Sequence, residues 1–440
     1  MYEYQVEGGF PIKGSITASG NKNAALPCIA ACLLTNEPVI LRNIPDIEDT
    51  NVMFQILMSL GVGVEKIGDH AWKVDAAKIN SSSIPAQMSR KIRASILFAG
   101  PLVARTGKAI MMPPGGDVIG RRRLDTHFAG LEAMGAKTGT RDGAYRIGIR
   151  RGRLKGAEIL LDEASVTATE NLLLAATLAE GETVLYNAAC EPHVQDLARL
   201  LVRMGAKIAG IGTNRLVVEG VRRLDGAKHR VESDHIEIGS FLAAAAATGG
   251  ELEISDLPGG YTMTILGRAF ARLGVKWRRT EKGLVMPRRQ KLVASDDMGG
   301  VLPKMEDGIW PAVPSDMMSV LLVLATQVQG GMLFFEKLFE SRMYFVDWLI
   351  AMGADIVQCD PHRVVVRGPR KLHGGKITSP DIRAGMALIV AALCADGESR
   401  IHRAEIIDRG YEKVDARLRA LGADVARIPD APSAPQLEMK

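Results

Sequence analysis

Val194-Gln-Asp-Leu-Ala-Arg-Leu-Leu-Val-Arg-Met204-Gly205-Ala206 is the stretch that decides the fold. Its apolar residues return every three or four positions, which predicts an amphipathic helix, and the glycine after Met204 predicts a helix C-cap. A β-rich run, Arg215-Leu-Val-Val-Glu219, follows in the same unit. The stretch therefore predicts a helix that ends at a glycine and leads into a strand.

This pattern returns along the whole chain, with glycines roughly 70 to 80 residues apart, at Gly61, Gly135, Gly205, Gly274, Gly353 and Gly422. Apolar helices rich in small residues return with the same period, at Ala24–Leu34, Ala94–Ala104, Ala168–Ala179, Ile238–Thr248, Ser315–Gln329 and Ala384–Ala395. Their wide apolar faces predict buried helices in close contact with their neighbours. Solenoid repeats usually span about 20 to 50 residues, so these longer units predict closed α/β domains instead.

Composition limits the function classes. The chain has 440 residues, 47% of them apolar, and a formal charge of +5, which favours two to three globular domains and a small anionic substrate over a nucleic acid. Only 5% of the residues are aromatic, too few for a base-stacking surface. The five cysteines lack metal-ligand spacing and indicate reduced, buried thiols in a cytoplasm, with no metal site. We expect no signal peptide or membrane span.

The stretch Pro113-Pro-Gly-Gly-Asp117-Val-Ile-Gly120 cannot extend a helix or a central strand, so it predicts an exposed, mobile loop over residues 113–123. Asp117 lies at its tip, and Arg121, Arg122 and Arg123 follow directly. A flexible carboxylate beside guanidinium groups suits the binding of an anionic substrate. Local grounds alone favour the alternative, a turn aspartate followed by a solvated basic face, and the functional interpretation depends on the rest of the chain.

Charged residues also stand at the starts of the buried helices and just after the repeat strands. Lys22 and Asn23 open the first such helix, where free backbone N–H groups favour an anion. Arg93 and Arg383 precede two others, and Asp316 opens a third, where it could simply cap the helix. Such charges are costly beside buried helices unless they are paired or bind a ligand.

Several motifs together, in this order along the chain, resemble the enolpyruvyl transferases. They are Ser19-Gly-Asn-Lys22-Asn23-Ala-Ala, Ile92-Arg93-Ala-Ser, the Pro-Gly-Gly-Asp117 loop, Arg122-Arg-Leu-Asp-Thr-His127, Ser165-Val-Thr-Ala-Thr-Glu-Asn171, Pro314-Ser-Asp316, Phe339-Glu-Ser-Arg342, Asp381-Ile-Arg383 and Asp408-Arg-Gly-Tyr-Glu412. The resemblance implies a two-domain inverse α/β barrel of six repeated βα subunits, three per domain. It also implies a discontinuous first domain, residues 1–21 plus 232–440, and a second domain, residues 22–231, with the active site in the cleft between them.

The resemblance implies that the enolpyruvyl group of phosphoenolpyruvate is transferred to the 3-hydroxyl of UDP-N-acetylglucosamine, with release of phosphate and without a cofactor. Lys22, Arg122 and Arg409 correspond to the phosphate site, and Arg342 and Arg383 to the rest of its cationic wall. Asn23 and Asp316 correspond to the contacts of the sugar hydroxyl, with Asp316 as its general base. The nucleotide-sugar contacts correspond to Arg93, Arg122, Arg123, Leu124, Asp125, Thr126, Ser165, Val166, Thr167 and the backbone at Leu338.

The sequence also departs from the family pattern. Asp117 stands where many members have a cysteine that the epoxide antibiotic fosfomycin alkylates, so the resemblance implies resistance, with Asp117 as a proton donor. Glu163 and His235 replace a frequent lysine and arginine, and residues 298–310 have no clear counterpart. Transfer to shikimate 3-phosphate or to a free nucleotide therefore stays open, as does a non-catalytic nucleotide-sugar-binding paralogue. We expect a cytoplasmic monomer or weak homo-oligomer.

Overall fold

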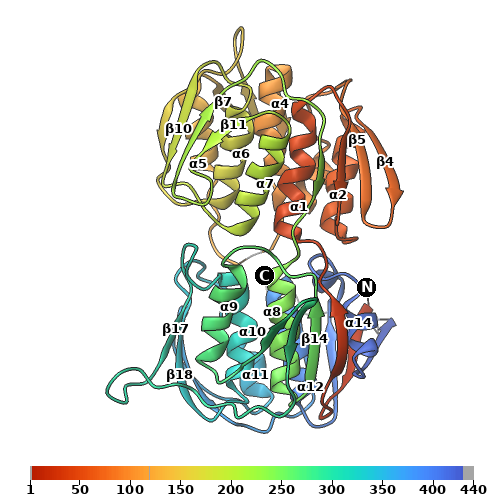
Figure 1. The fold of residues 1–440 in the computed structure, drawn as a ribbon, viewed down its shortest axis with the longest axis vertical. Helices are drawn as coiled ribbons and strands as arrows, with labels where there is room; N and C mark the ends of the chain where they lie inside the picture. Colours follow the sequence, from red (N-terminus) through yellow and green to blue (C-terminus); the bar gives the residue numbers. More distant parts are fainter. Residues whose placement is uncertain (1, 118, 430–440) are drawn as a thin grey trace.

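The computed structural model describes residues 2–117 and 119–429. Figure 1 shows two lobes, one above the other. The upper lobe has its own hydrophobic core, formed by residues between Ala24 and Val231. The core of the lower lobe combines residues between Tyr4 and Ala18 with residues between Ile236 and Val425. The chain therefore begins in the lower lobe, builds the upper lobe and returns.

Each lobe contains three sheets, so the described strands form six sheets that match the six repeats. The lower lobe holds β1 (Tyr2–Glu7) with β21 (Lys376–Thr378), β22 (Glu398–His402) and β23 (Asp424–Pro429); β2 (Lys13–Thr17) with β14 (Glu251–Ser255), β15 (Arg278–Thr280) and β16 (Gly283–Met286); and β17 (Lys304–Glu306) with β18 (Gly330–Phe335), β19 (Asp355–Asp360) and β20 (Arg363–Gly368). The upper lobe holds β3 (Val39–Arg42) with β4 (Gly63–Gly68), β5 (Ala71–Asp75) and β13 (Lys228–Arg230); β6 (Lys108–Met111) with β7 (Lys137–Arg141) and β8 (Ala144–Gly148); and β9 (Glu158–Leu160) with β10 (Glu182–Tyr186), β11 (Lys207–Ala209) and β12 (Arg215–Glu219).

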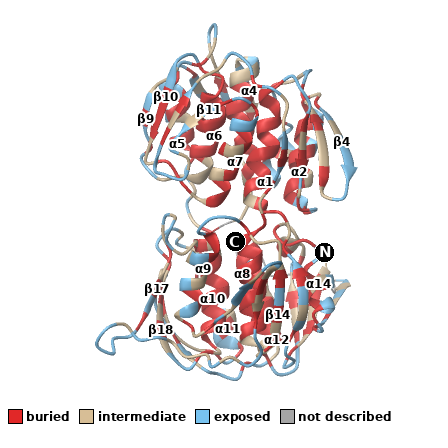
Figure 2. Ribbon diagram, in the orientation of Figure 1, coloured by how far each residue is buried: buried red, intermediate tan, exposed pale blue. Residues whose placement is uncertain are grey.

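The helices predicted to be buried lie inside these sheets. In the upper lobe they are α1 (Lys22–Ala31) with the 3-10 turn η1 (Cys32–Leu34), η2 (Arg93–Phe98) with α4 (Ala99–Thr106), and α6 (Val166–Ala176). In the lower lobe they are α8 (His235–Ala247), α10 (Ser315–Ala325) and α12 (Ile382–Cys394). Figure 2 shows them mostly buried, with exposed residues along the sheet edges. Helices inside and sheets outside make each lobe an inverse α/β barrel, as the resemblance implied.

The second helix of each repeat packs beside its sheet and ends as predicted. These helices are α2 (Glu48–Ser59), α5 (Asp125–Ala133), α7 (Pro192–Arg203), α9 (Thr262–Ala271), α11 (Val346–Ala351) and α14 (Val414–Ala420). All six repeat glycines have a positive φ, between 79° and 98°. After α7, Ala206 N–H donates to Leu201 O at 2.9 Å and Gly205 N–H to Val202 O at 3.0 Å, the two bonds of a Schellman cap. The glycines are needed because other residues adopt this backbone conformation only at a cost.

Two expectations about exposure are wrong. Of the described residues in the loop 113–123, only Pro113, Arg121 and Arg123 are exposed. The part before Asp117 packs on α3 (Ala86–Lys91), where a Cβ on Gly115 would lie 1.7 Å from Arg90 O. Val118, at the centre of the predicted mobile loop, lies outside the described residues. Cys359 is exposed, since it lies on β19, whereas Cys28, Cys32 and Cys190 are buried.

Among the described helices, none is long and apolar enough to cross a membrane.

Candidate active site

Four charged side chains meet where the lobes face each other. Asp49, in the first turn of α2, is buried and accepts from Lys22 Nζ at 2.8 Å and from Arg409 Nε at 3.0 Å. Arg409 Nη1 also donates to Asp117 Oδ1 at 2.6 Å. Arg409 belongs to the lower lobe, directly after the one-turn helix α13 (Glu405–Asp408), whereas its three partners belong to the upper lobe. Lys22, Asp117 and Arg409 are therefore brought together through Asp49 and Arg409 itself.

A second group of charges surrounds Asp316 at the start of α10. Arg342 Nη2 donates to Asp316 Oδ1 at 3.0 Å, and Arg383 Nη2 donates to Oδ2 at 2.9 Å. Asn23 Nδ2 reaches the same Oδ2 from the upper lobe at 3.5 Å. The N-cap of α10 is Pro314, without a side-chain bond, so Asp316 does not cap its helix. The capping explanation for Asp316 is wrong, because its carboxylate binds arginines instead.

The arginines set the charge states of these carboxylates. Burial raises the pKa of Asp316, but Arg383 and Arg342 outweigh burial and hold the pKa well below its usual range. The pKa of Asp49 is likewise lowered: Lys22 and Arg409 overcome the effect of burial. Both carboxylates are thus ionised, and each lies against cations that could also bind a phosphate or carboxylate of a ligand.

The expected nucleotide-sugar residues lie mostly in the upper lobe. Arg93 Nη2 donates to the backbone oxygens of Arg122 at 2.6 Å and Arg123 at 3.0 Å. These two hydrogen bonds hold the backbone at Arg122 and Arg123, at the end of the loop. Arg93, Arg122, Leu124 and Asp125 line part of a cavity of about 400 Å³, together with Phe128, Tyr145 and the strand residues opposite them. Burial lowers the pKa of Arg93 to about 10 and lowers that of Arg122 as well.

Other predicted contacts are engaged in local hydrogen bonds. Thr126 Oγ1 donates to Asp162 Oδ1 at 2.7 Å, and Arg123 Nη2 reaches Asp162 at 3.1 Å. Ser165 is the N-cap of α6, where it accepts from Ala168 N–H, and Val166 is the first residue of that helix. Thr167 Oγ1 lies 3.1 Å from His127 Nε2. Leu338 belongs to the lower lobe, where it is 43% exposed.

The loop after Asp117 contacts the lower lobe through its backbone. Ser341 N–H donates to Ile119 O at 3.1 Å, and Arg121 N–H donates to Glu340 Oε2 at 3.2 Å. A Cβ on Gly120, where φ is 136°, would lie 2.1 Å from Glu340 Oε2. The positive φ favours glycine at this position, and the Glu340 backbone N, 3.1 Å from the same Cβ, leaves little room for a side chain.

Sequence reasoning missed residues that complete the site. Asp49 is the most important, and an acidic residue in the first turn of a helix is too common to have identified it. Ser315 Oγ lies 3.3 Å from Arg342 Nε, and Asp381 lies 3.6 Å from Arg342 Nη1. The sequence feature that could have identified Asp381 as part of the site was its position two residues before Arg383.

Two of the unassigned sequence features, His235 and Trp310 at the end of segment 298–310, lie in contact at the junction of the lobes. His235 Nδ1 lies 3.2 Å from Asn21 Nδ2. The ring of His235 meets that of Trp310 edge-on, with centroids 6.1 Å apart. Trp310 O also accepts from Cys190 Sγ of the upper lobe at 3.3 Å. The end of segment 298–310 therefore contacts both lobes.

One cluster of side chains could be mistaken for a metal site. Cys28, Asp196 and His229 are buried, with potential ligand atoms within 4.8 Å of one another. Arg203 Nη1 lies 2.6 Å from His229 Nδ1, and a guanidinium can only donate. The proton of His229 is therefore on Nε2, which faces Asp196 Oδ1 at 3.2 Å. A protonated nitrogen cannot bind a metal, so we interpret the cluster as a buried polar network.

Known proteins share the sequence and the fold of this chain. The chain matches the family model described as EPSP synthase (3-phosphoshikimate 1-carboxyvinyltransferase) over residues 6–418. A Treponema denticola protein named UDP-N-acetylglucosamine 1-carboxyvinyltransferase is 53% identical over 425 residues, covering 97% of this chain and 99% of the relative. A Bradyrhizobium diazoefficiens protein of the same name is 51% identical over 431 residues, covering 98% and 99%.

Solved structures share the fold. The enolpyruvyl transferase NikO from Streptomyces tendae has a TM-score of 0.85 at 23% identity, covering 98% of this chain and 99% of its own. EPSP synthase from Acinetobacter baumannii has a TM-score of 0.75 at 19% identity, covering 97% and 100%. The chain is a transferase that belongs to the enolpyruvyl transferase family, among the relatives named UDP-N-acetylglucosamine 1-carboxyvinyltransferase.

Proposed function

We propose that this protein transfers the enolpyruvyl group of phosphoenolpyruvate to the 3-hydroxyl of UDP-N-acetylglucosamine and releases phosphate, the first committed step of peptidoglycan precursor synthesis. The names of relatives that are 51–53% identical over nearly the whole chain support this acceptor. The observation that carries the proposal is the meeting of Lys22, Arg342, Arg383 and Arg409 around carboxylates at the junction of the lobes.

In this proposal the phosphate of phosphoenolpyruvate binds Lys22, Arg122 and Arg409, and Arg342 and Arg383 complete the cationic wall. Asp49 and Asp117 already pair with these cations in the structure. The positions of these two carboxylates show where the surrounding cations stabilise a negative charge. A dianionic phosphate would compete with Asp117 for Arg409, and charge-assisted bonds from several donors favour the phosphate.

Asp316 takes the proton of the sugar hydroxyl, which Asn23 helps to hold. While Arg342 and Arg383 bind Asp316, its low pKa makes it a weak base. Binding of phosphoenolpyruvate draws these guanidinium groups toward the substrate and so raises the basicity of Asp316. The general base is therefore activated only when phosphoenolpyruvate is bound.

The reaction is an addition followed by an elimination. Once phosphoenolpyruvate displaces the Asp117 carboxylate from Arg409, Asp117 takes up a proton and delivers it to the methylene carbon, which leaves the neighbouring carbon electrophilic. The sugar oxygen adds there as Asp316 takes the hydroxyl proton. Loss of phosphate, with return of one methyl proton to the Asp117 carboxylate, then restores the carbon–carbon double bond of the enol ether. Fixed cations stabilise the charges throughout, which is the main source of rate enhancement in a site of this kind.

The nucleotide sugar binds mainly to the upper lobe in this proposal. Arg93, Arg122 and the residues Arg123, Leu124, Asp125 and Thr126 contact it, as do Ser165, Val166 and Thr167. Leu338 contributes its backbone from the lower lobe. The cavity beside Arg93 and Leu124 offers about 400 Å³ for part of this ligand.

We also propose domain limits and a cellular setting. The first domain comprises residues 1–21 plus 232–440, and the second comprises residues 22–231, which the two separate hydrophobic cores support. The protein acts in the cytoplasm as a monomer or weak homo-oligomer, without a metal or organic cofactor, and Asp117 makes it resistant to fosfomycin.

A phosphate-release assay with phosphoenolpyruvate and one acceptor at a time tests the proposal. UDP-N-acetylglucosamine is expected to support release, whereas UMP and shikimate 3-phosphate are not. Release with shikimate 3-phosphate alone or with UMP alone would assign a different acceptor. Binding of UDP-N-acetylglucosamine without any release would indicate a non-catalytic paralogue.

A further inference from the structure

The helix that carries Arg409 is too short to hold its own position. Helix α13 is a single turn of four residues, Glu405–Asp408, and Arg409 follows as its C-cap. Isolated turns of this length are unstable, because few internal hydrogen bonds offset the ordering of the backbone. The direction of the Arg409 side chain must therefore depend on what holds α13 from outside.

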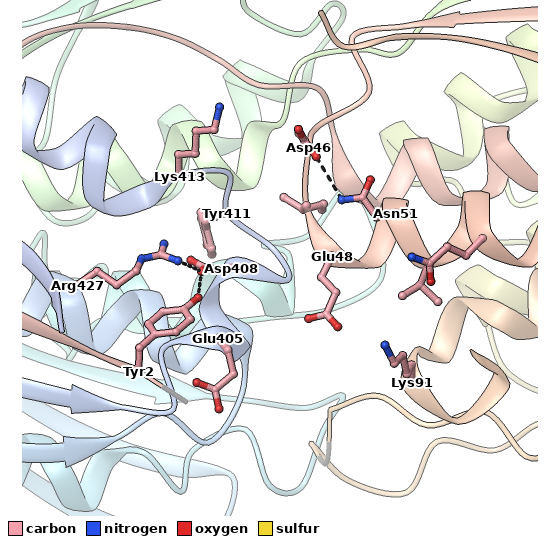
Figure 3. Close-up of a pocket in the computed structure, with 13 residues that line it drawn as sticks. Tyr2, Asp46, Glu48, Asn51, Lys91, Glu405, Asp408, Tyr411, Lys413 and Arg427 are labelled. Atoms are coloured by element: carbon pink, nitrogen blue, oxygen red, sulfur yellow. Dashed lines mark hydrogen bonds and ion pairs between the residues drawn. The ribbon is translucent and has the colours of Figure 1, made fainter. Parts of the chain in front are cut away.

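Asp408, the residue before Arg409, is held on both carboxylate oxygens. The Tyr2 hydroxyl donates to Oδ2 and the Tyr4 hydroxyl to Oδ1. Arg427 Nη1 lies 2.9 Å from Oδ2. Figure 3 shows Tyr2 and Arg427 converging on Asp408. Because Tyr2 and Tyr4 lie on β1 and Arg427 on β23, two neighbouring strands anchor the end of α13.

Arg427 is itself fixed from several sides. Its guanidinium lies 4.3 Å from the centroid of the Tyr2 ring and 5.3 Å from that of Tyr4. Nη2 donates to the Tyr4 hydroxyl at 2.9 Å and reaches Asp415 Oδ1 at 3.1 Å. Each tyrosine therefore makes two kinds of contact. Its hydroxyl donates to Asp408, and its ring lies against Arg427, the arginine that pairs with Asp408.

The same strand also holds the start of the turn. Ala404 N–H, at the N-cap of α13, donates to Tyr2 O at 3.2 Å. After Arg409 the backbone of Gly410 packs against Ile382, where a Cβ would lie 2.3 Å from Cγ2. Contacts before, at and after the turn thus fix its rotation, and Arg409 points at Asp49 and Asp117 in the upper lobe.

Ala404 and Ile407 pack into the lower-lobe core on one side of this turn, but the other side is open. A cavity of about 470 Å³ adjoins it, lined on one side by Tyr2, Glu405 and Asp408 and on the other by Glu48 and Lys91. Figure 3 shows the Glu48 and Lys91 side chains across this space from Asp408. Without its anchors, α13 has room to shift into the cavity.

We infer that Tyr2, Tyr4 and Arg427 are positioning residues for Arg409, acting through the Asp408 carboxylate. This inference rests on the proposed function, in which Arg409 binds the phosphate of phosphoenolpyruvate. Loss of the network is expected to weaken that substrate and to leave the nucleotide sugar unaffected, because the proposed nucleotide contacts lie elsewhere.

The test is the Tyr2→Phe/Tyr4→Phe double variant, which removes both hydroxyls and keeps both rings. We expect the KM for phosphoenolpyruvate to rise about tenfold or more, since bonds to a charged group are among the stronger hydrogen bonds. The KM for UDP-N-acetylglucosamine stays at the wild-type value, and the variant remains folded at the assay temperature. Tyr261→Phe is the matched control, because that side chain is 81% exposed.

A second pair of variants separates positioning from folding. Arg427→Gln is expected to raise the KM for phosphoenolpyruvate as the double variant does. Arg427→Lys is expected to raise this KM less, because lysine keeps a positive charge beside Asp408. An unchanged KM in the double variant overturns the inference. Equal increases in both KM values with a lower unfolding midpoint also overturn it, since they indicate a structural role only.

Failure of the proposed function has a different signature, namely a wild-type protein that releases no phosphate. Calorimetric titration with phosphoenolpyruvate, in the presence of UDP-N-acetylglucosamine, then still tests the inference. The double variant must bind phosphoenolpyruvate more weakly than the wild type and Tyr261→Phe. Equal affinities overturn the inference in that case as well.

Discussion

Asp316 accepts from Arg342 and Arg383 of the lower lobe and from Asn23 of the upper lobe. Asp316→Asn is expected to keep nucleotide-sugar binding and to lower kcat by about 10²–10⁴-fold, the usual contribution of a general base. The fold should survive, because Arg342 keeps Asp381 as a partner and Arg383 lies 5.4 Å from the Tyr411 ring centroid. Single-turnover kinetics and circular dichroism measure the two effects, and a folded variant with normal kcat would remove Asp316 from this role.

Asp117 lies against Arg409, which has a further consequence for reactivity. A thiol at this position would lie close to the guanidinium, which favours the nucleophilic thiolate. Asp117→Cys is expected to stay active and to become irreversibly inactivated by fosfomycin, with a covalent adduct visible by mass spectrometry. The wild type and Asp117→Ser should form no adduct. A cysteine variant without adduct would mean that the loop does not cover the reacting carbon.

His127 predicts how stability depends on pH. Asn171 Nδ2 lies 3.1 Å from His127 Nδ1, and Nε2 faces Thr167, so the neutral ring is satisfied on both sides. Burial lowers the pKa of His127 to about 3 from its ordinary 6.5. The His127 side chain therefore binds a proton more tightly in the unfolded chain than in the folded protein. The free energy of unfolding consequently falls as the pH drops from 6.5 toward 3.

His127→Gln removes this titration and keeps a donor for Thr167. In urea denaturation, the slope of the unfolding free energy against pH should decrease between pH 6.5 and 3, by at most about 1.4 kcal/mol per pH unit, the value for one proton. Burial also lowers the pKa of His193 to about 3, so part of the slope remains. The exposed His373, changed to Gln, is the control. An unaltered slope in His127→Gln would contradict the assignment.

At the scale of elements, small residues allow the buried helices to pack closely against one another. Gly100 of α4 lies so close to α6 that a Cβ would meet Asn171 O at 2.4 Å, and Gly100 N–H donates to Asn171 Oδ1 at 2.7 Å. Gly100→Ala is expected to destabilise the protein by about 1–3 kcal/mol through overpacking. Gly139→Ala is the control, because no atom lies within 4 Å of a Cβ there. Calorimetry showing equal unfolding temperatures for both variants would contradict this close packing.

The elements could be predicted because their signals are local. A glycine that ends a helix and a small-residue helix can each be recognised from neighbouring residues, and six copies of each removed the ambiguity of any one. The loop was predicted from Pro113 to Gly120, but its half-buried state was not, since that depends on contacts with Arg90 and Glu340 far away in the sequence. Asp49 escaped prediction for the same reason.

At the scale of the whole molecule, the site exists only where the lobes meet. Arg409 reaches Asp49 across 360 positions of sequence, and Asn23 reaches Asp316 across 293 positions. No local pattern specifies such pairs. The family resemblance supplied Lys22, Asp316 and the arginines as candidates, and the structure adds the carboxylates that these cations hold.

Proton NMR of the product formed in D₂O tests the central claim, addition and elimination at this junction, most directly. The wild type, given phosphoenolpyruvate and UDP-N-acetylglucosamine, should release phosphate in amounts equal to a vinyl ether on the sugar 3-oxygen. Deuterium should appear in the vinyl methylene, because the methyl group of the intermediate loses either isotope. Phosphate without a vinyl ether, or a vinyl ether that never contains deuterium, would contradict the account.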